Sequence, residues 1–486
     1  MKLKFKSIIA LATICFTTYS CTGDFVEMNT NPNESAKVAP QSFIGPALYK
    51  TISANLNRNL RVNNELVQVT VTTNNNLEFH RYEVRATETE YMWRNWYVEL
   101  TNFRDIYSSA AAGQQEGFRA YQAVSRILDV WVSSLLTDMY GDVPYFESNL
   151  GYEELNTTPV YDKQIDIYRD MFRKLEEANQ LLTDNTLPVA HASSDPLFAG
   201  NTLKWRKFGN SLYLRLLLRV SHKAELDAAV KIKEIVETKA DQYPIMASHD
   251  DSAILYFTSQ EPYINPYLNA RVIDFNGNKG YADFFIESLR ETGDPRMDIW
   301  ATQPTLGVYQ GMQSGYPRGQ VPEQQSTLAP GLMSSPLLGN IMNYAELQFI
   351  LAECALHEFI DQDLVNFYNN GVTASIQMWG KEVPVGHFNN PKVAILPEDN
   401  DNAVLKKIHL QKYFSLFLTD FQQWYEYRRT RALDLIPGPG LEGRTMPVRM
   451  TYPLITQALN KANYDEASAR MGGNTPNALM WWQPAN

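Results

Sequence analysis

Apolar residues recur at three- and four-residue steps over most of this chain, which is the spacing of one face of an α-helix. In residues 91–112 these positions are Met92, Trp96, Leu100, Phe103 and Tyr107. Similar stripes predict helices over residues 117–140, 162–183, 203–222, 225–240, 342–358 and 404–433. Successive helices of this kind read as stacked pairs, so the chain is predicted to be mainly α-helical.

Particular residues sharpen this prediction. Trp96, Trp131 and Trp205 have helical spacing and are expected in the core. Asp162 precedes the first apolar position of its helix and is the expected N-cap, because a carboxylate accepts hydrogen bonds from the free amides of a first turn.

Residues 243–340 interrupt the helical pattern. Glycine and proline punctuate this stretch, and helical periodicity survives only around residues 281–290. The stretch is also rich in tyrosine and phenylalanine, which argues against disorder. Because binding residues often lie on loops held by a rigid scaffold, we expect a large irregular ligand-binding region here. Residues 71–90 form a second loop-rich stretch, before the first long helical hairpin.

The first residues have the layout of an export signal. Three lysines precede an apolar run at 7–16, and small or polar residues lead to Cys21. That run has about half of the roughly twenty residues that a membrane-spanning helix needs. We therefore interpret residues 1–20 as a signal peptide and Cys21 as a lipid attachment site. The usual acylation motif has Leu three residues before the cysteine, where this chain has Thr18, so an incidental cysteine is the alternative.

The rest of the chain is predicted to form a tether and one domain. Residues 21–40 are polar and turn-rich, and we expect a lipidated tether there, followed by a single domain over 41–486. With Cys15 lost and Cys21 acylated, Cys354 is left without a disulfide partner and is expected in the core. Acidic residues outnumber basic ones by 54 to 43, and a net charge of −11 argues against a nucleic-acid partner.

Motifs for catalysis are missing from the sequence. His357-Glu358 lacks the second histidine of a zinc protease motif, and neither a nucleophile elbow nor a phosphate-binding glycine loop occurs. We therefore predict no catalytic residue, no cofactor and no metal site. Two acid-rich loops, at 249–251 and 397–402, could hold calcium, but neither fits a known calcium loop, and solvated loops are the preferred interpretation.

Several short segments occur in a characteristic order along the chain: Cys21 with 29–33 (NTNPN), 140–145 (YGDVPY), 205–212 (WRKFGNSL), 292–296 (TGDPR), 413–414, 424–429 (WYEYRR), 449–453 (RMTYP) and 481–482 (WW). Taken in this order, they resemble the SusD/RagB family of outer-membrane nutrient-binding lipoproteins. The resemblance covers nearly the whole chain. It implies tetratricopeptide-like helix pairs, an irregular ligand-binding part and a SusC-like TonB-dependent transporter as the partner.

The resemblance also implies where a ligand binds. In the family the ligand face uses the loop before the first long hairpin and the irregular middle region, here 71–93 and 256–320. Aromatic rings suit the C–H face of a sugar, and planar polar groups suit its hydroxyls. The candidate ligand-binding residues are Asn75, His80, Tyr82, Tyr263, Tyr267, Tyr309 and Tyr316. The alternative is that these side chains only pack their own loops.

The leading hypothesis is an outer-membrane lipoprotein, exposed at the cell surface, that binds oligosaccharides and delivers them to its transporter. A peptide ligand on the same scaffold is the first alternative. A lipid-anchored helical hydrolase and a purely structural envelope protein are the others. The starch specificity of the family's founding member does not transfer to this sequence.

The anchor hypothesis predicts the behaviour of one variant. Cys21→Ala removes the predicted acylation site, and the acyl chains are what would hold the protein durably to a membrane. We expect a folded protein in the soluble fraction after cell lysis and ultracentrifugation. If the variant still sediments with membranes, Cys21 is not the anchor.

Overall fold

A computed structural model describes residues 38–75, 78–113, 116–151, 154–270, 275 and 277–484. The predicted signal peptide, Cys21 and nearly all of the predicted tether lie outside the described residues. Residues 40–486 form one compact unit. None of the described helices is both long enough and apolar enough to cross a membrane.

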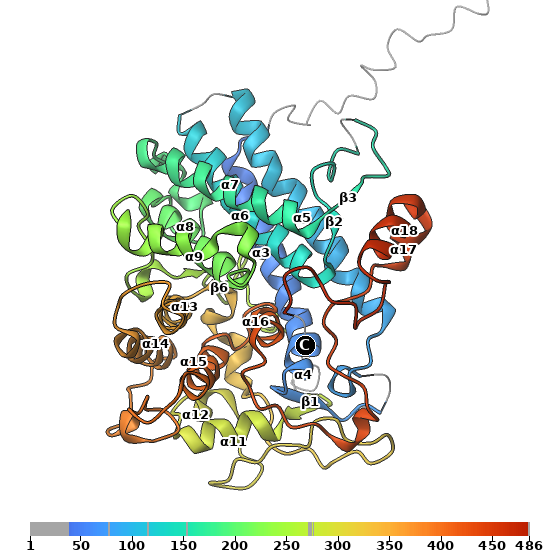
Figure 1. Ribbon diagram of the computed structural model, residues 1–486, viewed down its shortest axis with the longest axis vertical. Coiled ribbons are helices and arrows are strands. Elements are labelled where there is room, and N and C mark those ends of the chain that lie inside the picture. Colours follow the sequence, from blue (N-terminus) through green and yellow to red (C-terminus); the bar gives the residue numbers. More distant parts are fainter. Residues whose placement is uncertain are drawn as a thin grey trace, which may run out of the picture. The chain divides into compact units, whose positions relative to one another are not determined.

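Helix hairpins make up the first half of this unit (Figure 1). The helices are α3 (Gln41–Arg58), α5 (Ala86–Gly113), α6 (Phe118–Tyr140), α7 (Gln164–Asp184), α8 (Thr202–Arg219) and α9 (Ala228–Lys233). Successive helices pack against each other from α5 to α9. Trp96, Trp131 and Trp205 are fully buried between them, as predicted. The prediction of a mainly α protein with stacked helix pairs is confirmed.

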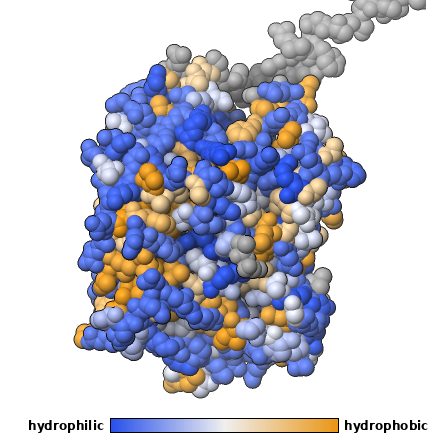
Figure 2. Space-filling model, in the orientation of Figure 1, coloured by the Kyte–Doolittle hydropathy of each residue, from blue (hydrophilic) through white to orange (hydrophobic). Residues whose placement is uncertain are grey.

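A second group of helices follows the irregular region. It contains α13 (Tyr344–Leu356), α14 (Leu364–Met378), α15 (Asp401–Ser415) and α16 (Gln422–Thr430), and α13 packs on both α14 and α15. Cys354 is buried in α13, as expected. On the face shown in Figure 2, hydrophobic surface gathers over α13 and α14, where Leu364 and Phe367 are only partly buried.

Two local predictions are wrong. The pattern over 404–433 predicts one helix, but the chain breaks into α15 and α16, with Leu418 and Asp420 in the left-handed region. Asp162 does not cap α7, because its carboxylate accepts the amides of Tyr145 and Phe146, each at 2.9 Å. Instead, the amide of Gln164 in the first turn is bound by Asp142.

Residues 243–340 contain little regular structure. The short helices α11 (Asp283–Thr292) and α12 (Met297–Trp300) lie here, together with β4 (Ala253–Ile254) and β5 (Lys279–Tyr281). Both strands pair antiparallel: β5 with β1 (Thr70–Thr72), which lies outside the region, and β4 with β6 (Asn340–Met342), which begins at the last residue of the region. A third pair joins β2 (Val143–Pro144) to β3 (Tyr161–Asp162). The pairing of β1 with β5 attaches the irregular region to the loop that precedes α5.

The last two helices of the described chain are short: α17 (Leu454–Leu459) and α18 (Lys461–Arg470). The helical pattern had not indicated either of them. None of the residues of α17 is buried, so no apolar stripe marked it in the sequence.

A buried ion network connects five helices of the unit. Its carboxylates are Asp138 of α6, Glu353 of α13 and Glu426 of α16, and its cations are Arg219 of α8, Lys412 of α15 and Arg429 of α16. All six side chains are at most 7% exposed. Each of the three carboxylates contacts at least one of these cations, which is the condition for keeping charges in a low-dielectric interior.

The network predicts the cost of removing one carboxylate. Glu426→Gln leaves Arg219, Lys412 and Arg429 with one fewer counter-charge, and we expect the free energy of unfolding to fall by about 3–5 kcal/mol. Urea unfolding followed by circular dichroism measures the change.

The matched control is the exposed pair of Lys461 and Asp465 on α18. Lys461→Gln should leave the unfolding midpoint close to that of the unchanged protein, because exposed ion pairs contribute little. Equal effects of the two substitutions would contradict the structural role of the network.

Candidate functional site

Three of the seven predicted ligand residues lie together. The rings of His80 and Tyr316 stack with their centroids 4.6 Å apart. Nδ1 of His80 accepts the Gly315 amide at 3.2 Å, and the side-chain oxygen of Asn75 accepts the Gly319 amide at 2.9 Å. The loop before α5 is thereby joined to the irregular region. His80 and Tyr316 are each 1% exposed, so both side chains are occupied by contacts within the protein.

The other four predicted residues make their contacts with different partners. Tyr267 is buried, and its hydroxyl donates to the Leu56 carbonyl at 2.7 Å. Tyr82 is half-buried near Gln68, and burial raises its pKa to about 12. Tyr263 lies beside Tyr49, and the Tyr309 hydroxyl donates to Asp298 at 3.0 Å. None of these contacts joins the four residues to His80 and Tyr316, and the role of all seven in binding stays a prediction.

An open cavity lies next to this loop, between the end of α3 and the start of α5. Its volume is about 480 Å³. We call it the α3–α5 cavity, and its lining residues are Arg58, Thr87, Glu90, Tyr91, Arg94, Asn95 and Val98. The volume is within the range of small-molecule sites, which is roughly 300–1,000 Å³. The irregular region reaches the α3 wall, because Tyr267 binds Leu56 two residues before Arg58.

The centre of the α3–α5 cavity is an arginine over an aromatic ring. The Arg58 guanidinium carbon lies 3.8 Å from the centroid of the Tyr91 ring. Glu88 holds this arginine from one side, with 3.4 Å between Nε and Oε2, and binds Arg61 at 2.9 Å. A fixed guanidinium, an aromatic ring and the amide of Asn95 supply the planar donors and the apolar surface that a sugar requires.

The predicted range 71–93 overlaps the residues that line this cavity, but none of the seven predicted ligand residues lines it. Tyr91 and Arg94 lie at or next to the end of the predicted range 71–93, yet neither was chosen. The polar face of the predicted helix could have indicated these residues. Thr87, Tyr91, Arg94 and Val98 share this face of α5, and the buried Met92 and Trp96 lie on the opposite face. No feature of the sequence indicated Arg58, because its position over Tyr91 depends on how α3 packs on α5.

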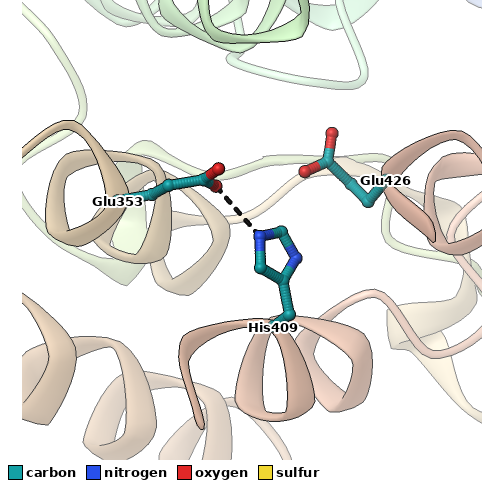
Figure 3. Close-up of side chains that lie close together, drawn as sticks. All are labelled: Glu353, His409 and Glu426. Atoms are coloured by element: carbon teal, nitrogen blue, oxygen red, sulfur yellow. Dashed lines mark ion pairs between the residues drawn. The ribbon is translucent and has the colours of Figure 1, made fainter. Parts of the chain in front are cut away.

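Glu353, His409 and Glu426 form the one group, among the residues that the structure describes, with the spacing of a metal site (Figure 3). Their surroundings do not suit a metal. Both oxygens of Glu353 accept from Arg429, at 2.6 and 2.7 Å, and Lys412 donates to Glu426 at 2.7 Å. Burial alone would raise the pKa of both glutamates, but Arg429, with His409 or Lys412, holds both well below the usual value. A divalent cation would have to displace these positive groups.

The successive packed helix pairs place the molecule in the stacked-hairpin class of α-helical proteins. A family model described as "Starch-binding associating with outer membrane" matches residues 32–453. The chain therefore belongs to the SusD-like family. No curated protein matches it by sequence.

Solved structures agree on the fold. A chitin-binding protein is 25% identical, with a TM-score of 0.77 over 92% of this chain and all of its own. A chitin-binding SusD homologue from Flavobacterium johnsoniae is 21% identical, with a TM-score of 0.78 over 92% of this chain and 99% of its own. A SusD homologue from Bacteroides fragilis is 22% identical, with a TM-score of 0.77 over 93% of this chain and all of its own.

Burial of His80 predicts a pH dependence of stability. Burial, reinforced by Arg81 and Lys279, lowers its pKa to about 3. Between pH 3 and the ordinary value near 6.5, the unfolded chain takes up a proton that the folded protein does not, so stability falls as pH falls. At pH 5 this proton uptake lowers the free energy of unfolding by about 2 kcal/mol relative to neutral pH.

His80→Asn tests this, because the asparagine oxygen can replace Nδ1 as acceptor for Gly315 but does not titrate. We expect the drop in unfolding free energy between pH 7.5 and pH 5 to be smaller in the variant, as measured by urea titration at both pH values. The same drop in both proteins would show that His80 is protonated in the folded state.

Proposed function

We propose that this chain is a lipoprotein of the outer membrane, anchored through Cys21, that binds oligosaccharides in the α3–α5 cavity. It has no catalytic activity of its own and delivers its ligand to a SusC-like TonB-dependent transporter. Membership of the SusD-like family supports the ligand class and the membrane. The observation that carries the proposal is the Arg58–Tyr91 pair in a cavity of about 480 Å³.

The lining of the cavity favours an uncharged ligand. Arg58 and Arg94 supply positive charge, but Glu90 lines the same wall and Glu88 neutralises Arg58. The charges therefore largely cancel, whereas an anionic ligand would need surplus cations. Hydroxyl groups of a sugar can pair with donors and acceptors of both kinds. Oligosaccharides of N-acetylglucosamine are suitable first probes, since two proteins of this fold bind chitin.

Tyr91→Ala tests the site. Losing the ring removes the apolar platform of the α3–α5 cavity, and we expect binding to weaken about tenfold. Isothermal titration calorimetry with soluble oligosaccharides of N-acetylglucosamine, maltose, cellulose and xylan measures this. Thermal unfolding establishes that the half-buried position tolerates the change.

The double variant Tyr263→Ala/Tyr309→Ala is the comparison, because both tyrosines belong to the site predicted from the sequence. Loss of binding in the double variant, with full binding in Tyr91→Ala, would move the ligand to the irregular region. Binding of peptides but of no oligosaccharide would contradict the proposed ligand class.

A further inference from the structure

A second cavity lies further along α5. Its volume is also about 480 Å³, and helices α5, α6 and α7 form its walls together with the loop after β2. We call it the α5–α7 cavity. Its lining residues are Thr101, Arg104, Asp105, Tyr107 and Ser108 of α5, Ser125, Arg126 and Asp129 of α6, Lys174 of α7, and Phe146, Ser148, Asn149 and Leu150 of the loop.

An exposed aromatic ring stands at this cavity. Phe146 is 52% exposed, although large apolar side chains are usually covered in a folded protein. Its backbone is fixed, because the amides of Tyr145 and Phe146 both donate to Asp162. The ring of Tyr145 packs edge-on against it at 4.9 Å. Phe146 therefore presents a held apolar face next to polar groups, the arrangement on which a sugar ring stacks.

The polar groups of the α5–α7 cavity are also held in place. The Arg126 guanidinium lies 4.0 Å from the centroid of the Tyr107 ring, and Glu177 accepts from Arg126 at 3.0 Å. Arg104 donates to the Ser148 hydroxyl at 2.7 Å and contacts Asp129 at 3.3 Å. The pair of Arg126 and Tyr107 repeats the arrangement of Arg58 and Tyr91 in the first cavity. Side chains fixed in advance lose little freedom when a ligand binds.

One stripe of α5 runs from the first cavity to the second. Its positions, at steps of three and four residues, are Thr87, Tyr91, Arg94, Val98, Thr101, Asp105 and Ser108. None of these side chains is buried, whereas the opposite face of the helix is. At 1.5 Å per residue, the stripe is about 30 Å long. Val98, 52% exposed, supplies apolar surface between the two cavities.

We propose that one extended oligosaccharide lies along this stripe of α5 and occupies both cavities, with Phe146 as the platform of the distal subsite. The inference rests on the proposed function and adds the class of ligand: an unbranched glycan long enough to reach from Tyr91 to Phe146. A short oligosaccharide fills the α3–α5 cavity alone. Affinity therefore increases with chain length until the ligand reaches Phe146.

The test combines chain length with one substitution. The probes are unbranched oligosaccharides of N-acetylglucosamine, maltose, cellulose and xylan, each from two to eight units, and the measurement is isothermal titration calorimetry on the full folded chain. For the series that binds, we expect higher affinity for the longest members than for the shortest. Phe146→Ala should weaken binding of the longest members about tenfold and leave the shortest unchanged.

Leu203→Ala is the matched control, because Leu203 lies on α8 and is also 52% exposed. It should bind every probe like the unchanged protein. Tyr91→Ala should weaken short and long members alike.

Four outcomes would overturn the inference. Affinity that does not depend on chain length, or equal binding of long probes by Phe146→Ala and the unchanged protein, removes the distal subsite. Either result leaves the proposed function standing if Tyr91→Ala still weakens binding. If no probe binds, the proposed function and the inference fail together. Binding of peptides alone, lost in Phe146→Ala, would assign the α5–α7 cavity to a protein partner.

Discussion

The buried ion network between α6, α8, α13, α15 and α16 is the constraint on which the rest of the structure depends. A charge inside a protein is stable only where its partner is within contact distance, so the network permits one relative placement of these helices. Glu426 meets Lys412 of the preceding helix because the chain breaks between α15 and α16. The same contacts leave Glu353, His409 and Glu426 close together while making them unsuited to a metal.

The network positions the proposed ligand surface through α6. Arg219 binds Asp138 of α6, and the Tyr425 hydroxyl of α16 donates to the Leu135 carbonyl. Helix α6 in turn packs along α5, with Ser125 donating to the Phe103 carbonyl at 2.6 Å. On its other side, Trp96 of α5 donates to Asn55 of α3 at 2.8 Å. The apolar half of α5 is thus covered, and its polar half is left to form the two cavities on a rigid helix.

This arrangement explains how one scaffold can serve different ligands. The solved relatives share the fold at 20–25% identity. At that level the helices and their packing persist, while side chains on an exposed stripe are free to change. In the proposed function, the ligand depends on residues such as Arg58, Tyr91 and Phe146 rather than on the fold. Family membership indicates carbohydrate binding, and the two cavities are where we propose that it takes place.

The sequence by itself determined most of the long helices, the buried tryptophans and the family. Helical periodicity is a local property, so Trp96, Trp131 and Trp205 could be placed from spacing alone, and Cys354 from its lack of a disulfide partner. Only the tertiary structure decided the break between α15 and α16, the diversion of Asp162 to the loop after β2, and the pairing of Arg58 with Tyr91. Each of these depends on segments far apart in the sequence, where an interior partner outweighs the local preference. His80 and Tyr316 also depend on tertiary packing. Their side-chain types suit ligand binding, but both are buried in the folded protein.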